Sequence, residues 1–358
     1  MMALPVTGIG QSCFAKAELT FNTGVVVEAT DAVSPTELKI TPEQEWLKSE
    51  EHSGSASLQT EVEGLRGGAW DGTFYVKPIT AGSEPDIGAI ITAAGFSHST
   101  NTYSLNSSDA SSLQILKAEG TYSEIINGAW VEELNLNVEG NGIPTFNAKG
   151  RFASHGHCLG AITCSSGSGT SYTLDSGDAF KITPGARITI DGDNNSGDGY
   201  LVTAVNAAGT GITIGSTGPT LSGGEAVIPF IPSTTTAGNV LGAIACNLSV
   251  GGTSVGFIDF KLNYKTGISG LDQEASADRA NRVVRGMREV TGTMKFYLLD
   301  ENSAFIGQAW EGTTQAISCR VGANTTGQRM TVALPAARIS VAEIETPGTE
   351  AAVYEADL

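Results

Sequence analysis

Apolar and polar residues alternate strictly over residues 129–139, AWVEELNLNVE, which is the clearest pattern in the chain. The apolar positions are Leu134, Leu136 and Val138, and the polar ones are Glu133, Asn135, Asn137 and Glu139. Asn141–Gly142 then favours a tight turn, and residues 143–152 return as a second strand. The pattern predicts a hairpin with one buried face and one wet, acidic face, as the wall of a barrel with a watery lumen requires.

Short runs of β-branched and aromatic residues between Gly, Asn and Pro turns predict strands through most of the chain. The runs lie at 17–27, 36–41, 68–78, 241–250, 254–264, 284–299, 315–322, 328–334 and 336–345. Two polar stretches, 42–62 and 265–283, follow no clean period and are expected to be long loops.

Two short helices are expected among these strands. In the first, Ser83 is the N-cap, Pro85 lies in the first turn, and Asp86 completes a variant of the capping box. Its apolar residues fall on one face and predict packing on a sheet, and Gly95 ends it. These residues are Ile87, Ile90, Ile91 and Ala94. The second helix is expected over 301–311.

Residues 157–237 differ from their surroundings. They begin with a Gly-, Ser- and Thr-rich stretch and contain five short strand candidates with Gly, Asn and Asp turns between them. Polar, Thr-rich segments flank them on both sides. This segment is predicted to be an inserted small β-barrel or sandwich.

The two flanks of this insert resemble each other when the chain is shifted by about 222 positions. LKI at 38–40 falls on FKL at 260–262, GLR at 64–66 on GMR at 286–288, and FY at 74–75 on FY at 296–297. With a small gap, the two helices also match, and the turn at Asn141–Gly142 matches Asn324–Gly327. Chance alignment of two β-rich segments is the alternative. The repeat predicts tandem domains at 1–156 and 238–358.

Composition narrows the function. The net charge of −18 disfavours ordinary nucleic-acid binding, which needs clustered Lys and Arg. The five cysteines are odd in number and scattered, so reduced thiols are expected. No run approaches the roughly 18 apolar residues of a membrane helix, and the N-terminus makes a poor secretory signal.

Two segments have a composition that metal sites use. His155, His157, Cys158 and Cys164 lie close together, but their spacing is not that of a zinc site, and surface histidines with free thiols explain them better. Residues 191–198, DGDNNSGD, resemble a calcium loop in composition. The position that should hold its closing glutamate is Val202, so a hairpin turn is the better interpretation.

No catalytic motif or convincing acid–base pair is present, so the chain is not expected to be an enzyme, and no cofactor is expected. Trp70, Trp130 and Trp310 could stack on sugars, but their places in regular elements favour core packing.

In its order of elements the chain resembles the tail tube proteins of long-tailed bacteriophages, in particular the two-tube-domain family with a β insert. The resemblance covers 17–156 and 238–345 as tube domains and 157–237 as a surface decoration. Its motifs are GLR before GTFYVKP, PDIGAIITAAGF, WVEELNLNVEGNGIPTFNAKGRF, VVRGMREVTGTMKFYLL and RMTVALPAARIS. It implies a mostly β fold of two tandem sandwich- or barrel-forming tube domains, each with one short helix, plus the small inserted β domain.

The resemblance implies a structural virion protein, assembled in the host cytoplasm, whose copies close into trimeric rings with pseudo-sixfold symmetry. In each domain the helix is expected outside the inner sheet. The rings stack around a tape-measure protein, meet tail terminator and tail tip proteins at the ends, and conduct double-stranded DNA without binding it specifically. No membrane is involved.

Site residues follow from the resemblance and the pattern. Loops 42–62 and 265–283 would grip the next ring, with Glu43, Glu50, Glu51, Ile268, Asp272 and Glu274 as candidates. Glu133 and Glu139 are candidates for an acidic lumen that repels DNA; the alternative places them on the outer surface. The other function classes left open are a secreted or capsid-decorating glycan-binding protein and the tube of a contractile injection system.

Overall fold

The computed structural model is mostly β, as the sequence predicts, and two short α-helices lie within the part of the chain it describes. The described residues are 11–48, 61–77, 85–105, 111–160, 162–175, 177–233, 239–271, 280, 282–299, 304–324, 329–340, 344–345 and 352–358.

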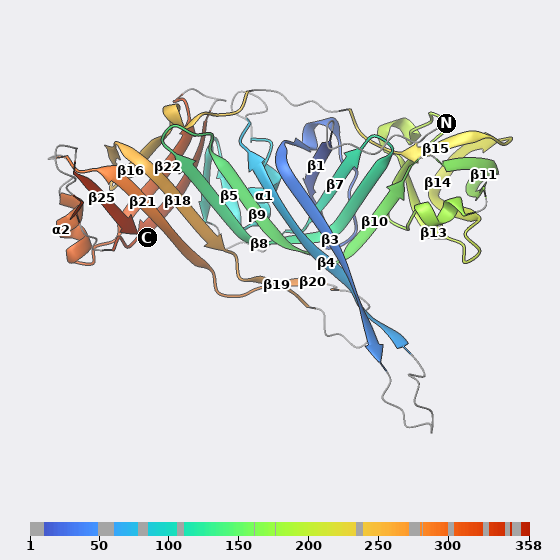
Figure 1. Ribbon diagram of the computed structural model, residues 1–358, viewed down its shortest axis with the longest axis horizontal. Coiled ribbons are helices and arrows are strands. Elements are labelled where there is room, and N and C mark those ends of the chain that lie inside the picture. The colour runs from blue at the N-terminus through green and yellow to red at the C-terminus, as the bar shows by residue number, and fades with distance from the viewer. Residues whose placement is uncertain are drawn as a thin grey trace, which may run out of the picture.

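One antiparallel sheet of eight strands, here called the long sheet, spans the molecule (Figure 1). Its order is β3 (Pro35–Lys48), β4 (Glu61–Tyr75), β9 (Thr145–Phe152), β8 (Tyr122–Glu139), β18 (Phe257–Lys265), β21 (Glu289–Tyr297), β25 (Val353–Asp357) and β24 (Ile344–Glu345). The first four strands precede the predicted insert and the last four follow it. Their junction is the β8·β18 pair, so the sheet runs through both flanks without a break.

Shorter strands form the layer behind the long sheet. The first half of β8 also pairs with β7 (Leu113–Glu119) and β10 (Ser154–Leu159), and β7 continues to β1 (Ser12–Ala17) and β2 (Ala32–Val33). A separate sheet has the order β17 (Thr253–Val255), β16 (Asn247–Val250), β22 (Gln315–Gly322), β23 (Arg329–Ala337), β6 (Thr102–Leu105) and β5 (Phe96–Ser99). One hydrophobic core joins residues of both flanks.

The registers of the two flanks coincide, which supports the internal repeat. Leu38 pairs with Gly72 in the β3·β4 hairpin, and Phe260 pairs with Met294 in the β18·β21 hairpin, each 222 positions later. A β-bulge follows Pro35 in the first hairpin and Phe257 in the second, again 222 apart. Because a bulge is a local feature with its own backbone geometry, its recurrence at the same register is stronger evidence than the few sequence identities.

The strands behind the long sheet also repeat, at different sequence shifts. Leu113 pairs with Ala129 before a bulge in β7·β8, and Gln315 pairs with Ala337 before a bulge in β22·β23. The β22·β23 hairpin therefore corresponds to β7·β8. The predicted match of the turn at Asn141–Gly142 with Asn324–Gly327 is wrong, because the counterpart of the β8–β9 turn lies between β24 and β25.

The first helix is shorter and more deeply buried than the pattern predicts. α1 (Gly88–Ala93) starts after Ile87, which makes no side-chain cap, and Ser83 lies outside the described residues. Nearly every residue from 85 to 96 is buried, so α1 is enclosed between the layers and does not rest one face on a sheet. It packs against β1, β7 and β8.

The second helix, α2 (Ala304–Trp310), lies within the predicted range 301–311, at the end of the molecule opposite the insert (Figure 1). Phe305 and Ala309 are buried, whereas Trp310 is 78% exposed. Core packing is therefore confirmed for Trp70 and Trp130, at 2% and 4% exposed, and wrong for Trp310.

Several strand predictions also need correction. The strand expected at 17–27 lies earlier, as β1, and Leu19 is 96% exposed in the loop after it. Residues 42–48 are not a loop but the continuation of β3. The last predicted strand, 336–345, is divided between the end of β23 and β24, and β25 was not predicted at all.

The insert forms a closed five-stranded barrel, one of the two architectures predicted for it. Its strands, in barrel order, are β11 (Ile162–Leu174), β14 (Gly211–Leu221), β13 (Tyr200–Val205), β12 (Arg187–Ile190) and β15 (Glu225–Pro229). Its hydrophobic cluster is separate from the main core and includes Cys158 of β10, the strand beside which the barrel lies (Figure 1).

Candidate assembly surface

One face of the long sheet, here called the polar face, carries the polar positions of seven of its strands. The registers align these positions in rows that cross the sheet at right angles to the strands. One row alternates in charge across six strands: Lys39, Asp71, Lys149, Glu133, Lys265 and Glu289. The next row is uncharged at its centre, where Asn147, Asn135 and Asn263 are neighbours. Opposite charges on paired strands stabilise a sheet, and here they also fix its register.

Ion pairs within the alternating row are short. Lys149 Nζ lies 2.7 Å from a Glu133 carboxylate oxygen, and Lys265 Nζ lies 2.9 Å from Glu289. Partial burial alone would raise the pKa of Glu133, but the Lys149 ammonium and a hydrogen bond from the Asn135 amide outweigh it and lower that pKa. Glu133 is therefore held in its charged form.

The polar face is close to charge-balanced. Its carboxylates are Glu37, Glu43, Asp71, Glu133, Glu139, Asp259, Glu289, Glu355 and Asp357. Its cations are Lys39, Lys149, Arg151, Lys261, Lys265 and Lys295. At the paired positions in the body of the sheet, leaving out the arm beyond Glu43 and the bulge residue Glu132, nine acids against six cations give a formal charge of −3, whereas the whole chain has −18. Glu133 and Glu139 both lie on the polar face, but most of the acidity of the chain lies elsewhere.

The two outer strands of the long sheet, β3 and β24, are each paired on one side only within the described residues. On the open side of β3, the Lys117 ammonium donates to the Leu38 carbonyl oxygen at 3.0 Å. Pro42, which has no N–H, also lies in this strand. A proline and a lysine at an edge are features that natural sheets use against uncontrolled pairing.

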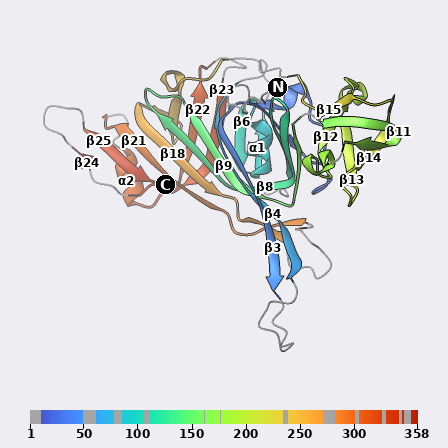
Figure 2. The ribbon, with the colours of Figure 1, turned by 45° about the vertical axis from the view of Figure 1, so that its right-hand side comes forward.

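The β3·β4 hairpin extends beyond the body of the molecule as an arm (Figures 1 and 2). Trp46 and Leu47 in its outer half are 50% and 51% exposed. Large apolar side chains on a projecting element are typical of a contact surface for another protein.

The counterpart of the arm in the second flank is bent back. Here β18·β21 ends at Lys265, and a separate hairpin of β19 (Ile268–Leu271) and β20 (Arg282–Arg285) follows it. Thr266 is fully buried, and its hydroxyl donates to the Val131 carbonyl oxygen at 2.6 Å. Gly267 has φ +65°, a conformation that favours glycine, and its position allows the close approach of Met287.

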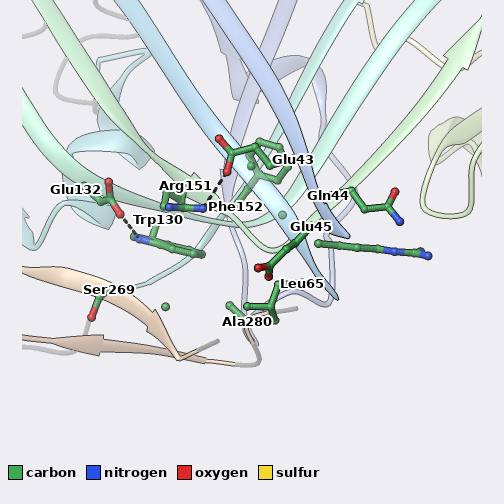
Figure 3. A pocket seen from close by; sticks show the side chains of 14 residues that line it. Glu43, Gln44, Glu45, Leu65, Trp130, Glu132, Arg151, Phe152, Ser269 and Ala280 are labelled. Carbon is green, nitrogen blue, oxygen red and sulfur yellow. Dashed lines mark hydrogen bonds and ion pairs between the residues drawn. The ribbon is translucent and has the colours of Figure 1, made fainter. Parts of the chain in front are cut away.

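A cleft of about 530 Å³ lies between the base of the arm and the β19·β20 hairpin (Figure 3). Trp130 forms its floor, with its indole N–H donating to Glu132 at 3.2 Å. Arg151 and Glu43, 3.0 Å apart, line the side that belongs to the long sheet. The two stretches predicted as matching loops therefore meet at one place, although neither is simply a loop.

The predicted stacking residues fall in different surroundings. Glu43 is exposed in β3 and paired with Arg151, whereas Ile268 is 4% exposed and packs with Trp130, which excludes it from a contact surface. Glu50, Glu51, Asp272 and Glu274 lie outside the described residues. Trp46, Leu47 and Met287 were not predicted as surface contacts, and Met287 is 92% exposed beside the bend.

The two segments considered for metal binding are explained by local structure. His155 contacts Glu124, and burial raises the pKa of the Cys158 thiol to about 12. Asp193 accepts hydrogen bonds from the Asn195 amide and the Tyr200 hydroxyl within its turn. The described part of the chain holds no group of three potential metal ligands, and its five cysteines are unpaired.

No helix among the described residues is long and apolar enough to cross a membrane. No protein-family model matches the chain, and no curated protein has a significantly similar sequence.

Proposed function

We propose that this protein is a structural building block that assembles with itself into stacked rings and so forms a tube, the tail tube of a long-tailed bacteriophage. The observation that carries the proposal is the long sheet. It is built from two copies of one four-strand unit, and one of its faces is polar. Its two outer strands are the first strand of one copy, β3, and the last strand of the other, β24.

The internal junction is the pattern that we propose for the contact between chains. β8 of the first unit pairs with β18 of the second, so the unit already joins to itself once within the chain. A further copy of the chain would add two more units in the same way, from β24 to β3. A head-to-tail contact of this kind generates a closed ring if the rotations between successive copies add up to one full turn.

Three chains would give a barrel with six units. At about 4.8 Å per strand, twenty-four strands give a backbone circumference of roughly 115 Å, and strand tilt widens it further. The bore is then about 40 Å, which leaves room for a DNA duplex. The polar face lines this bore, and the buried face with α1 and the outer strands lies outside it.

The charge on the polar face changes the expected relation to DNA. With −3 per chain, three chains contribute about −9 to the wall of one ring, far less than the total charge of the chains would suggest. The six cations of each polar face include four, Lys149, Arg151, Lys261 and Lys265, that have carboxylate partners within 3.0 Å. A wall of paired charges offers DNA few free cations for counterion release, so DNA slides without being held.

Ring stacking is assigned to the arm. Its exposed Trp46 and Leu47 project from the body, and the cleft beside Trp130 offers a partly apolar surface at its base. These features favour contact between successive rings.

Negative-stain electron microscopy of the purified, concentrated protein tests the proposal. We expect hollow filaments with a bore of about 40 Å. Globular particles that stay monodisperse when concentrated would contradict it and would favour a decorating or binding module instead.

A further inference from the structure

The repeat within the long sheet specifies how one chain meets the next. We infer that the chain-to-chain junction reproduces the β8·β18 junction residue for residue, with Ile344 of one copy directly opposite Ile40 of the next copy. The inference rests on the proposed assembly into rings and adds the register of the contact, which the proposed function leaves open.

β3 is the counterpart of β18 in the first unit. The β3·β4 and β18·β21 hairpins share one register and one bulge at a constant shift of 222 positions. Leu262 in β18 therefore corresponds to Ile40 in β3. Both stand on the buried side of their strands, and both contact the main core.

β24 is the counterpart of the second half of β8. In β8·β9, Leu136 pairs with Phe146; in β24·β25, Ile344 pairs with Tyr354. On its other side, Phe146 pairs with Phe74 of β4, and Tyr354 pairs with Phe296 of β21. Phe74 and Phe296 are themselves counterparts at the shift of 222 positions. Ile344 is therefore the counterpart of Leu136, at a shift of 208 positions.

The layer behind the long sheet checks this shift independently. Ile126, in the first half of β8, pairs with Ile115, and Leu334, in β23, pairs with Ile317. The shift from Ile126 to Leu334 is again 208. One constant shift thus relates β8 to the segment that runs from β23 to β24.

Leu136 and Leu262 are directly opposite each other in the internal junction. They are 2% and 4% exposed, whereas Ile344, at the open edge, is 39% exposed. Leu136 is therefore covered by its cross-strand neighbour inside the chain, whereas its counterpart Ile344 has no such neighbour among the described residues. The repeat indicates that Ile40 of a second copy covers Ile344. Burial of the Ile344 side chain then favours association.

The junction between chains is weaker than the one within the chain. The internal ladder runs at least from Gly140 N–H···O=C Ile258 to Thr266 N–H···O=C Glu132, at 2.8 and 2.9 Å. The counterpart of Tyr264 in β3 is Pro42, which cannot donate to a ladder. The Leu38 carbonyl oxygen already accepts a hydrogen bond from Lys117, which competes for it with the N–H of a partner strand. An open edge with these two obstacles keeps the free chain from pairing in other registers.

Disulfide trapping in assembled protein tests the register. Cysteines at Ile40 and Ile344, introduced together in a Cys246→Ser background, would be about 5.5 Å apart between Cα atoms across the junction, within disulfide range. Two control pairs represent slips by two residues in either direction: Leu38→Cys with Ile344→Cys, and Pro42→Cys with Ile344→Cys. Assembly takes place under reduction, and diamide then oxidises the thiols.

The inferred register predicts that the Ile40→Cys/Ile344→Cys pair links chains at least tenfold more efficiently than either control and yields covalent closed trimers on non-reducing gels. Tubes in which a slipped pair links better, or in which no pair links, would overturn the register while leaving the proposed function intact. Wild-type protein that forms no tubes would overturn both.

A pair of single variants tests the contact without cysteines. Ile344→Asp should leave the chain folded, because this side chain is already 39% exposed, and should abolish assembly; Ile344→Leu should assemble. Ile228→Asp, on the inserted barrel and 38% exposed, is the matched control and should assemble normally. Normal tubes from folded Ile344→Asp would contradict the inference.

Discussion

Among the described glycines, Gly150 is the one at which an added side chain would have the least room. It pairs with Trp70, and its lack of a side chain lets the indole N–H of Trp70 reach the Trp130 carbonyl oxygen, 3.2 Å away on the next strand. A bulge after Val131 brings that part of β8 out of regular register. A Cβ at position 150 would collide with the Trp130 carbonyl oxygen.

Gly150→Ala should therefore lower the free energy of unfolding by about 3 kcal/mol, the range of a core overpacking that the backbone must absorb. Urea unfolding followed by tryptophan fluorescence measures it. Gly242→Ala is the control: it has open space around it and φ −95°, so its effect should stay within about 0.5 kcal/mol. Equal effects of the two variants would contradict the assigned role of Gly150.

Asp86 is a buried carboxyl group just before α1. Its backbone N–H donates to the Lys77 carbonyl oxygen at 2.9 Å, and its side chain accepts from the Lys77 N–H at 3.1 Å. Burial raises its pKa to about 6, and the hydrogen bonds that its carboxylate accepts, that from the Lys77 N–H foremost, only partly oppose that shift. The folded state thus holds this proton at a pH where the unfolded chain has lost it.

The sign of the effect follows from linkage. A raised pKa in the folded state gives stability that is complete below pH 4 and is lost as the pH rises through about 6. Asp86→Asn removes this titration, so it should gain about 3 kcal/mol relative to wild type between pH 4 and pH 8. Denaturant unfolding of both proteins at the two pH values measures the gap. A gap that does not change with pH would show that Asp86 is not protonated in the folded state.

Single residues were the least predictable from the sequence. The alternation at 129–139 placed Glu133 and Glu139 correctly on one polar face, because the period of a strand fixes its faces. It could not reveal that Lys149 neutralises Glu133, since the partner comes from another strand. Trp310 was expected in a core because it ends a helix, but α2 covers the sheet with other residues.

At the scale of elements, the arm is the feature assigned to ring stacking. Replacing Trp46 and Leu47 by serine removes exposed apolar surface without touching the core, so the chain should fold and close into rings. Stacking should be lost, with single rings or short stacks in place of long tubes in electron micrographs. Leu201→Ser, on the inserted barrel and 37% exposed, is the matched control. Long tubes from the double variant would remove the arm from the stacking contact.

The inserted barrel should be dispensable. It closes on itself, and only Cys158 of its hydrophobic cluster lies outside it, in β10, which pairs with β8 and must remain. Replacing 161–229 by a flexible linker should leave folding and tube formation intact. Circular dichroism and negative-stain microscopy of this variant measure both. An unfolded product would show that the barrel supports the rest of the chain.

Strands with a regular alternation of apolar and polar residues were predicted well. The predictions that were wrong have physical causes. Residues 42–47 lack a period because they are exposed on both sides, and their strand conformation comes from pairing with β4. β25 is only five residues long and acquires its place from β21. α1 was predicted with one apolar face, but glycine and alanine on its other sides let both layers approach it.

At the scale of the whole molecule, the duplication could be suspected from a few matched residues, but its extent could not. The sequence shift of 222 holds for one hairpin, while β8 follows a shift of 208 and β7 one of 202. Because insertions between the strands change the shift, an ungapped comparison finds only the first. Pairing registers do not depend on loop length. They match between the two flanks both in the long sheet and in the layer behind it.

The continuous sheet also changes the meaning of the charge. A net charge of −18 suggested an acidic bore, but the face assigned to the bore carries paired charges and only −3. Charge balance on this face suits a conduit that neither binds nor strongly repels its cargo.

The most direct test of the account is a helical reconstruction of the assembled protein by cryo-electron microscopy. We expect a tube whose inner wall is the long sheet, with Glu133 and Lys149 facing the bore and the inserted barrels on the outside. A tube with these residues on its outer surface, or a wall in which the long sheets of neighbouring chains do not join edge to edge, would contradict it.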